Sequence, residues 1–288
     1  MSMIKKIKIW LIAIRPKTLF ITLGPIYIGL QLTKKYGFFD STTAIITLLS
    51  ALLIQIGTNL ANDYYDGLKG SDQNRDNRML ASGKLSEKAL RNAYLFCFFL
   101  ASLLGLFLVY IGGTAILIIG LTGIFFGWLY TATPYALAYR GLSEPFILAY
   151  FGPVAVAGTY YVQNLNFSIY ACILGLGPGC LAIAILTINN LRDHEEDIKS
   201  NKKTLIVRFG VSFGYIFYSL MWLVALIIPM LIYFLHTKHM LLLSLQVLAI
   251  PAIFLIKQLK SLDPNYDVLL SRTGRYLLLY CLLLGIAC

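Results

Sequence analysis

The chain has 288 residues, of which 58% are hydrophobic and only 13% are charged, and its formal net charge is +11. A soluble protein of this length needs far more polar surface, so the composition excludes a soluble globular fold. The positive charge alone would also suit a nucleic-acid-binding protein, but the way it is distributed along the chain argues against that class.

Apolar runs of about twenty residues recur from end to end, which is the length of a transmembrane helix. They predict an all-α polytopic membrane protein of one domain, residues 1–288, with its helices in a single bundle around a polar site open to the cytoplasmic side. We expect about nine spans, in chain order 10–32, 43–66, 89–110, 113–133, 144–163, 168–191, 209–235, 240–258 and 273–288.

Two of these spans have particular features. The first follows a short basic N-terminus without a cleavage site, which we interpret as the start of that span and not as a signal peptide. The fifth contains Pro145, Gly152, Pro153 and Gly158, which membrane helices tolerate where neighbouring helices satisfy the freed backbone groups. The five cysteines lie within predicted spans without CxxC spacing, and we interpret them as small apolar side chains.

The basic residues predict the orientation of the chain. With the N-terminus in the cytoplasm, all 24 Lys and Arg residues except Lys34, Lys35 and Lys238 fall on the cytoplasmic side. This asymmetry follows the positive-inside rule, so the excess charge reflects topology and not nucleic-acid binding. We therefore expect a multi-pass protein of the cell inner (cytoplasmic) membrane.

Two acidic clusters follow the second and sixth spans and face the cytoplasm in this topology. They hold eight of the 13 acidic residues: Asp63, Asp66, Asp72, Asp76, Asp193, Glu195, Glu196 and Asp197. Asparagines precede the acids in each cluster, at Asn59 and Asn62 and at Asn189 and Asn190. Each cluster ends the second helix of a group of four, which predicts two internal repeats with a polar site where they meet.

The spacing of the carboxylates favours a metal site. Asp63 and Asp66 are three residues apart and Asp193 and Asp197 are four apart, so each pair lies on one helix face. Like charges this close repel each other unless a cation is bound. Mg²⁺ prefers oxygen ligands and often shares its shell between carboxylates and phosphates, so facing clusters predict a clamp for a diphosphate. The alternative is a pair of solvated loops, which single charge runs at a membrane usually are.

These motifs resemble those of the UbiA superfamily of membrane prenyltransferases. Within it, the chain resembles the MenA branch, the 1,4-dihydroxy-2-naphthoate polyprenyltransferases of menaquinone synthesis. The resemblance rests on five segments in order along almost the whole chain, 15–19, 57–72, 129–142, 189–205 and 273–275. Residues 76–79 depart from the branch's usual Gly-Pro pair, and Asn201 and Ser143 stand where glycine is common.

The resemblance implies transfer of a polyprenyl group from polyprenyl diphosphate to 1,4-dihydroxy-2-naphthoate with loss of CO₂, giving demethylmenaquinone. The implied ligands of Mg²⁺ are Asn62, Asp63, Asp66, Asp72, Asp193 and Asp197, and the implied catalytic residues among them are Asp66, Asp193 and Asp197. The implied substrate-binding residues are Asn59, Lys69, Arg75, Tyr130, Arg140, Asn190 and Lys203, of which the four basic ones pair with diphosphate oxygens.

Several further residues have two interpretations each. Tyr64, Tyr65, Tyr130 and Tyr135 either line an allylic cation by cation–π contact or are interfacial aromatics. Arg15 and Lys17 either contact the substrates or are topogenic charges, and Glu144 is either catalytic or placed at a helix N-terminus.

Two alternatives to the implied function remain open. Within the enzyme class, the acceptor could be another molecule such as 4-hydroxybenzoate, chlorophyllide, haem or homogentisate. From another class, a secondary transporter also has repeats and broken spans, although its polar site is expected at the membrane midplane and not at the helix ends.

Overall fold

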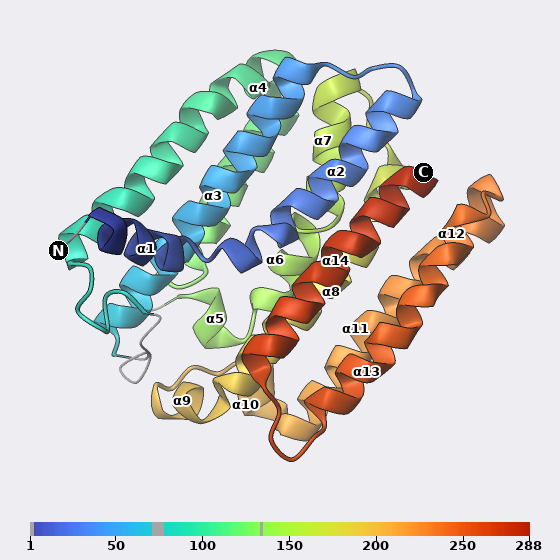
Figure 1. The fold of residues 1–288 in the computed structure, drawn as a ribbon. Coiled ribbons are helices and arrows are strands. Elements are labelled where there is room, and N and C mark those ends of the chain that lie inside the picture. The colour runs from blue at the N-terminus through green and yellow to red at the C-terminus, as the bar shows by residue number, and fades with distance from the viewer. Residues whose placement is uncertain (1–2, 71–77, 133–134) are drawn as a thin grey trace.

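The computed structural model describes residues 3–70, 78–132 and 135–288, the side chains of residues 236 and 237 excepted. Every regular element in these ranges is a helix, which confirms the all-α class (Figure 1). The α-helices are α1 Met3–Ile14, α2 Phe20–Lys35, α3 Ser41–Leu68, α4 Glu87–Leu129, α5 Leu137–Arg140, α6 Ser143–Tyr150, α7 Pro153–Asn164, α8 Ile169–Arg192, α9 His194–Lys199, α10 Leu205–Phe209, α11 Val211–Ile232, α12 Leu241–Ser244, α13 Ala249–Leu259 and α14 Tyr266–Ala287. Short 3₁₀ or π segments are η1 Pro16–Thr18, η2 Tyr233–Thr237 and η3 Leu245–Leu248.

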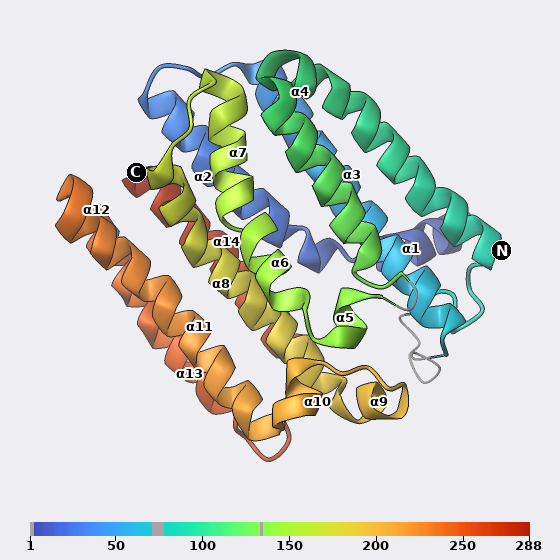
Figure 2. The same ribbon diagram turned by 180° about the vertical axis from the view of Figure 1, so that it is seen from behind.

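Seven helical stretches in the described ranges are long and apolar enough to cross a membrane, and the bent pair α1–α2 makes an eighth. The chain is therefore a multi-pass membrane protein. The count is below the nine spans predicted because the segments predicted at 89–110 and 113–133 are the two arms of one helical element, α4, and are counted together. The helix axis of α4 breaks at Gly113, whose φ of 63° favours glycine. Figure 2 shows the chain reversing direction there, so the two arms of α4 run side by side.

The first predicted span, 10–32, is not one straight helix. The axes of the segments Met3–Thr18 and Phe20–Lys35 differ by 52°. Pro16 lacks the N–H that an α-helix needs, and Arg15 before it has a left-handed φ of 55°. The side chain of Asn59 compensates for the break, because its Nδ2 donates to the carbonyl of Ile14 at 2.8 Å and to Thr18 Oγ1 at 3.1 Å.

The interrupted fifth span is confirmed as a broken helix, α6 followed by α7. The break lies beside α8, where the backbones approach so closely that a Cβ on Gly175 would lie 2.5 Å from Gly152 C and Pro153 N. Small residues permit such contacts between membrane helices. The surrounding helices bury 83% of the apolar window of α8, which makes it the central helix of the bundle.

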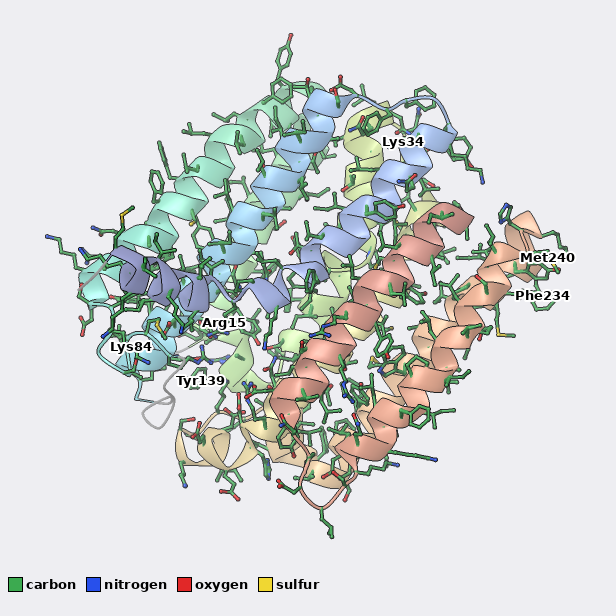
Figure 3. All side chains as sticks on the ribbon, viewed as in Figure 1. Arg15, Lys34, Lys84, Tyr139, Phe234 and Met240 are labelled. Atoms are coloured by element: carbon green, nitrogen blue, oxygen red, sulfur yellow. The ribbon has the colours of Figure 1, made fainter. Side chains whose placement is uncertain are left out.

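Both acidic clusters lie at the same end of the bundle. The carboxyl ends of α3 and α8 reach the end where the short helices α5, α9 and α10 gather (Figure 1). Arg15, Lys84 and Tyr139 are at this end, whereas Lys34, Phe234 and Met240 are at the other (Figure 3). The segments that join the spans at the first end therefore enclose the candidate site.

Candidate active site

A cavity of about 410 Å³ runs through the bundle between α2, α3, α4, α6, α7 and α8. Its walls are mostly apolar, and on α8 they include Ala182, Ile185 and Leu186. Polar side chains line it toward the end that carries the acidic clusters, namely Arg15, Asn59, Asn62, Tyr130 and Asn189. The arrangement suits a long apolar chain with a charged group at one end.

Asn62 binds the side chains of two arginines. Its Oδ1 accepts hydrogen bonds from Arg15 Nη2 and from Arg78 Nη1, each at 2.6 Å. Arg78 and Asn62 are both buried, so the guanidinium groups depend on these oxygen acceptors. Two arginines from different segments, the α1–α2 bend and the α3–α4 connection, are thereby held beside the first acidic cluster.

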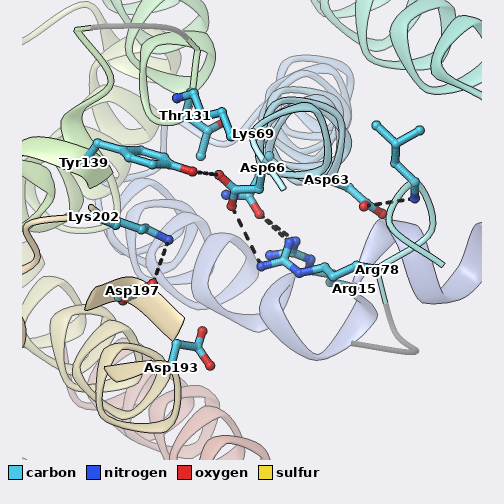
Figure 4. A network of polar contacts seen from close by, with 12 residues as sticks. Arg15, Asp63, Asp66, Lys69, Arg78, Thr131, Tyr139, Asp193, Asp197 and Lys202 are labelled. Atoms are coloured by element: carbon cyan, nitrogen blue, oxygen red, sulfur yellow. Dashed lines mark hydrogen bonds and ion pairs between the residues drawn. The ribbon is translucent and has the colours of Figure 1, made fainter. Parts of the chain in front are cut away.

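The two carboxylates of the first cluster face different partners. Asp63 accepts from the backbone N–H of Met79 at 2.9 Å and of Leu80 at 3.4 Å, so it orders the connection that leads to α4. Asp66 accepts from Tyr139 Oη at 3.0 Å and lies 4.0 Å from Arg78 Nη2. Figure 4 shows Asp66 pointing toward the centre of the polar network, while Asp63 points to the connection.

Lys202 links the two clusters. Its Nζ lies 3.6 Å from Asp197 Oδ1 in the second cluster. Burial alone would lower the pKa of Lys202, but the negative charges of Asp66 and Asp197 outweigh it, so the pKa is raised. Carboxylates separated by more than a hundred residues therefore interact with one ammonium group, as the sequence pattern predicts for clusters that face each other.

Tyr139 sits between the clusters. Its ring lies 3.7 Å from Lys69 Nζ and 5.6 Å from Lys202 Nζ, within the range of cation–π contacts. Its backbone carbonyl accepts from Lys203 N at 3.1 Å. One tyrosine from α5 thus joins the end of α3 to the segment between α9 and α10.

The second cluster is also tied to α14. Asp193 contacts Arg192 Nε at 2.7 Å, and Arg192 Nη1 reaches Asp267 at 3.3 Å. Asp193 and Asp197 are both buried, and Figure 4 shows them on neighbouring turns below Lys202. The first residues of α14 therefore help to hold the second cluster.

The other predicted site residues fall into two groups. Tyr130 lines the cavity, and Asn190 is buried on α8. Arg140 and Lys203 instead line an exposed outer pocket together with Lys69, Tyr139 and Arg208. Lys69 also donates to the carbonyl of Thr131 at 3.0 Å. The predicted residues Asp72 and Arg75 lie outside the described residues.

No three His, Cys, Asp or Glu side chains converge on one point in the part of the chain that the structure describes. The carboxylates are held by Arg78, Tyr139, Lys202 and Arg192 instead. The atoms at the site that could bind a metal are nonetheless almost all carboxylate and amide oxygens, the ligand type that Mg²⁺ prefers. Two buried carboxylates, Asp66 and Asp197, already interact with the same cation, so the donor chemistry fits a divalent metal.

Three site residues were not identified from the sequence. Arg78 belongs to residues 76–79, which depart from the branch pattern, Tyr139 to the resembling segment 129–142, and Lys202 to the lysines that follow the second acidic cluster. Their position next to acidic clusters depends on how distant segments fold together. The signal available in the sequence was a basic residue close to a carboxylate motif, because a charge that becomes buried on folding needs a partner.

Comparison with known proteins identifies the family. Residues 22–281 match the UbiA prenyltransferase family. The chain belongs to this family.

Relatives within the UbiA family have specific names. The chain is 34% identical to the 1,4-dihydroxy-2-naphthoate octaprenyltransferase of Haemophilus influenzae over 233 residues. The aligned region covers 77% of this chain and 75% of that protein. The Escherichia coli protein of the same name is 35% identical over 216 residues, 72% of this chain and 70% of that protein. The fold is similar to that of a UbiA homolog from Archaeoglobus fulgidus bound to GPP and Mg²⁺, with a TM-score of 0.71 and 17% identity over 97% of this chain and 99% of that one.

Proposed function

We propose that this UbiA-family protein transfers a polyprenyl group from polyprenyl diphosphate to 1,4-dihydroxy-2-naphthoate with loss of CO₂, giving demethylmenaquinol, the reduced form of demethylmenaquinone. The main support is the meeting of two acidic clusters around Lys202 and Tyr139 at one end of an apolar cavity. The names of the relatives support the choice of acceptor.

Asp66, Asp193 and Asp197 would hold Mg²⁺, with Asn62, Asp63 and Asp72 completing the proposed ligand set. The metal would neutralise the diphosphate and so stabilise it as a leaving group. Asp63 has a second task in the structure, since it accepts from two backbone N–H groups of the α3–α4 connection. Arg78 lies 4.0 Å from Asp66 and Lys202 lies 3.6 Å from Asp197, so each of these carboxylates also has a cationic partner.

The basic residues of the outer pocket, at the same end of the bundle as the acidic clusters, would bind the diphosphate oxygens. Lys69, Arg140 and Lys203 line the outer pocket next to Tyr139, and Arg75 belongs to the same proposed set. The allylic C–O bond breaks with its electron pair leaving on the diphosphate. The cavity then excludes water from the allylic cation, and Tyr130 offers it an aromatic face.

The acceptor provides the electron pair of the new C–C bond. Its carboxylate-bearing ring carbon attacks the allylic carbon, and the electrons of the carboxylate C–C bond restore the aromatic ring as CO₂ leaves. Asn59 and Asn190 belong to the proposed substrate-binding set, although Asn59 also holds the α1–α2 bend. Diphosphate and CO₂ are the two groups released.

We further propose nine spans, with the acidic clusters on the cytoplasmic side of the inner membrane. At 1.5 Å per residue, the 43 residues of α4 would be roughly 65 Å long if straight, about twice the hydrocarbon thickness. The break of α4 at Gly113 therefore supports two membrane spans within α4 and not one. The distribution of Lys and Arg supports the orientation.

The decisive experiment uses acceptor labelled at the carboxyl carbon. Purified protein given labelled 1,4-dihydroxy-2-naphthoate, a long-chain prenyl diphosphate and Mg²⁺ is expected to yield unlabelled prenylated product and labelled CO₂. Prenylated product that retains the label would instead support an acceptor prenylated at a ring carbon that bears hydrogen. Transport activity without any prenylated product would support the transporter.

A further inference from the structure

The hydroxyl groups that line the cavity fall into two classes. Thr47, Thr58 and Ser102 each donate to the carbonyl oxygen four residues earlier, over 2.7, 2.9 and 2.9 Å. Their hydrogen-bonding capacity is used within their own helices, so they present an apolar surface to the cavity. Such walls suit a hydrocarbon chain.

Thr22 and Ser50 differ from these. Both line the cavity and are buried, yet neither hydroxyl has a hydrogen-bond partner among the residues described. Gln55 lines the same cavity at 8% exposure, and its amide makes no hydrogen bond to any other described side chain or backbone group. A buried polar group without a partner is destabilising, and more so within a membrane span, so three together point to a ligand.

Two of the three side chains, Thr22 and Gln55, lie at the same depth, and Ser50 lies deeper. Arg15 pairs with Asn62 and Thr18 with Asn59, which fixes α2 antiparallel to α3. Thr22 is one helical turn beyond Thr18, and Gln55 is one turn before Asn59. In an antiparallel pair of helices, Thr22 is therefore level with Gln55. At 1.5 Å per residue, Gln55 is about 10 Å deeper in the membrane than Asn62, and Ser50 about 7 Å deeper again. Asn189 of α8 lines the same cavity.

The chemistry of the substrates narrows the choice of ligand. A polyprenyl chain has no hydrogen-bonding group, and its diphosphate belongs with the cations at the end of the cavity. Thr22 and Gln55 carry no charge, so they suit a neutral hydroxyl and not a carboxylate. Arg15, which lines the cavity nearer the acidic clusters, provides the positive charge for a carboxylate.

We propose that Thr22 and Gln55 form an acceptor subsite that binds the 4-hydroxyl of the naphthoate, the hydroxyl farther from its carboxylate. This inference rests on the proposed function. The Gln55 amide oxygen accepts a hydrogen bond from the phenolic O–H, and rotation about χ1 turns the hydroxyl of Thr22 toward the ligand. Because the carboxylate end is held near Arg15, the ring is oriented with its reactive carbon toward the allylic diphosphate.

The test pairs substrates with variants. Wild-type protein is compared with Gln55→Leu and Thr22→Val, using 1,4-dihydroxy-2-naphthoate and 1-hydroxy-2-naphthoate, which lacks the 4-hydroxyl. Wild type is expected to prefer the dihydroxy compound by roughly 10-fold in kcat/KM, and Gln55→Leu to lose most of this preference. The KM for the prenyl diphosphate should stay within about twofold in each variant.

Thr58→Val is the matched control, because its hydroxyl is already bonded within α3. It is expected to keep the wild-type preference. A second readout needs no turnover: in the absence of prenyl diphosphate and metal, the dihydroxy compound should raise the melting temperature of wild type more than that of Gln55→Leu. The ligand-free Thr22→Val protein should melt at or above the wild-type temperature, since it loses only an unpartnered hydroxyl.

The outcomes separate this inference from the proposed function. If wild type makes no prenylated naphthoate, the proposed function is wrong. If wild type is active and both variants keep its substrate preference and its ligand-induced melting shift, the acceptor subsite is wrong and the proposed function stands. A melting temperature of Thr22→Val well below wild type would also contradict the inference, because it would show a structural role for the hydroxyl.

Discussion

Tyr139→Phe tests whether the contact between the two acidic clusters supports catalysis. The substitution removes the Oη–H that donates to Asp66 at 3.0 Å and leaves the ring beside Lys69 and Lys202. A hydrogen bond to a charged group is worth about 1.5–3 kcal/mol, and Asp66 is buried, so solvent does not screen it. If Tyr139 orients Asp66 in the transition state, kcat/KM should fall by roughly 10- to 150-fold.

The assay is prenyl transfer at saturating Mg²⁺, with both substrates varied. Tyr135→Phe is the control, because Tyr135 lies in the same connection and its ring also contacts a cation, Arg140 at 4.9 Å. Tyr135 is largely exposed, so the control should stay within about twofold of wild type. Wild-type kcat/KM in Tyr139→Phe would refute the reasoning, since the bond to Asp66 would then be dispensable.

The remaining predictions concern the metal, the acids and the packing of α8. Chelation with EDTA should abolish turnover and added Mg²⁺ restore it; full turnover in metal-free buffer would contradict the proposed ligand set. Asp66→Asn and Asp193→Asn should each lower kcat by at least about 100-fold while the purified proteins keep wild-type melting curves to within a few degrees; an active variant would remove that residue from the set. Gly175→Ala should cost about 1–3 kcal/mol, because its Cβ would meet the backbone of the α6–α7 break, whereas Gly105→Ala, with open space around it, should not lower the melting temperature; equal melting temperatures would show that the break adjusts freely.

The sequence was sufficient for the fold class because long apolar runs have few alternatives in a membrane. It was less reliable where backbone groups depend on a distant partner. The break at Pro16 is stable because Asn59, on the next span, satisfies the carbonyl of Ile14. The turn at Gly113 differs, since it falls at the boundary between the predicted spans 89–110 and 113–133.

The same distinction applies to the site. Asp66 and Asp197 could be placed from their positions at the ends of spans, because topology alone brings both ends to one side. Arg78 and Tyr139 could not, since they reach Asp66 from connections whose course depends on packing. The i,i+3 spacing of Asp63 and Asp66 also predicted a shared face, whereas the backbone of Met79 draws Asp63 toward the α3–α4 connection.

The unequal burial of the two helices that carry the acidic clusters links the site to the thickness of the bilayer. Protein covers 83% of the apolar window of α8 but only 39% of that of α3. A mismatch between hydrophobic length and bilayer thickness acts on helix surfaces that touch lipid, where it changes tilt. A thinner or thicker membrane would therefore tilt α3 while α8 stays fixed by its neighbours. The distance between Asp66 and Asp197 would change with it, so the acyl-chain length of the surrounding lipid sets how well the two halves of the site meet.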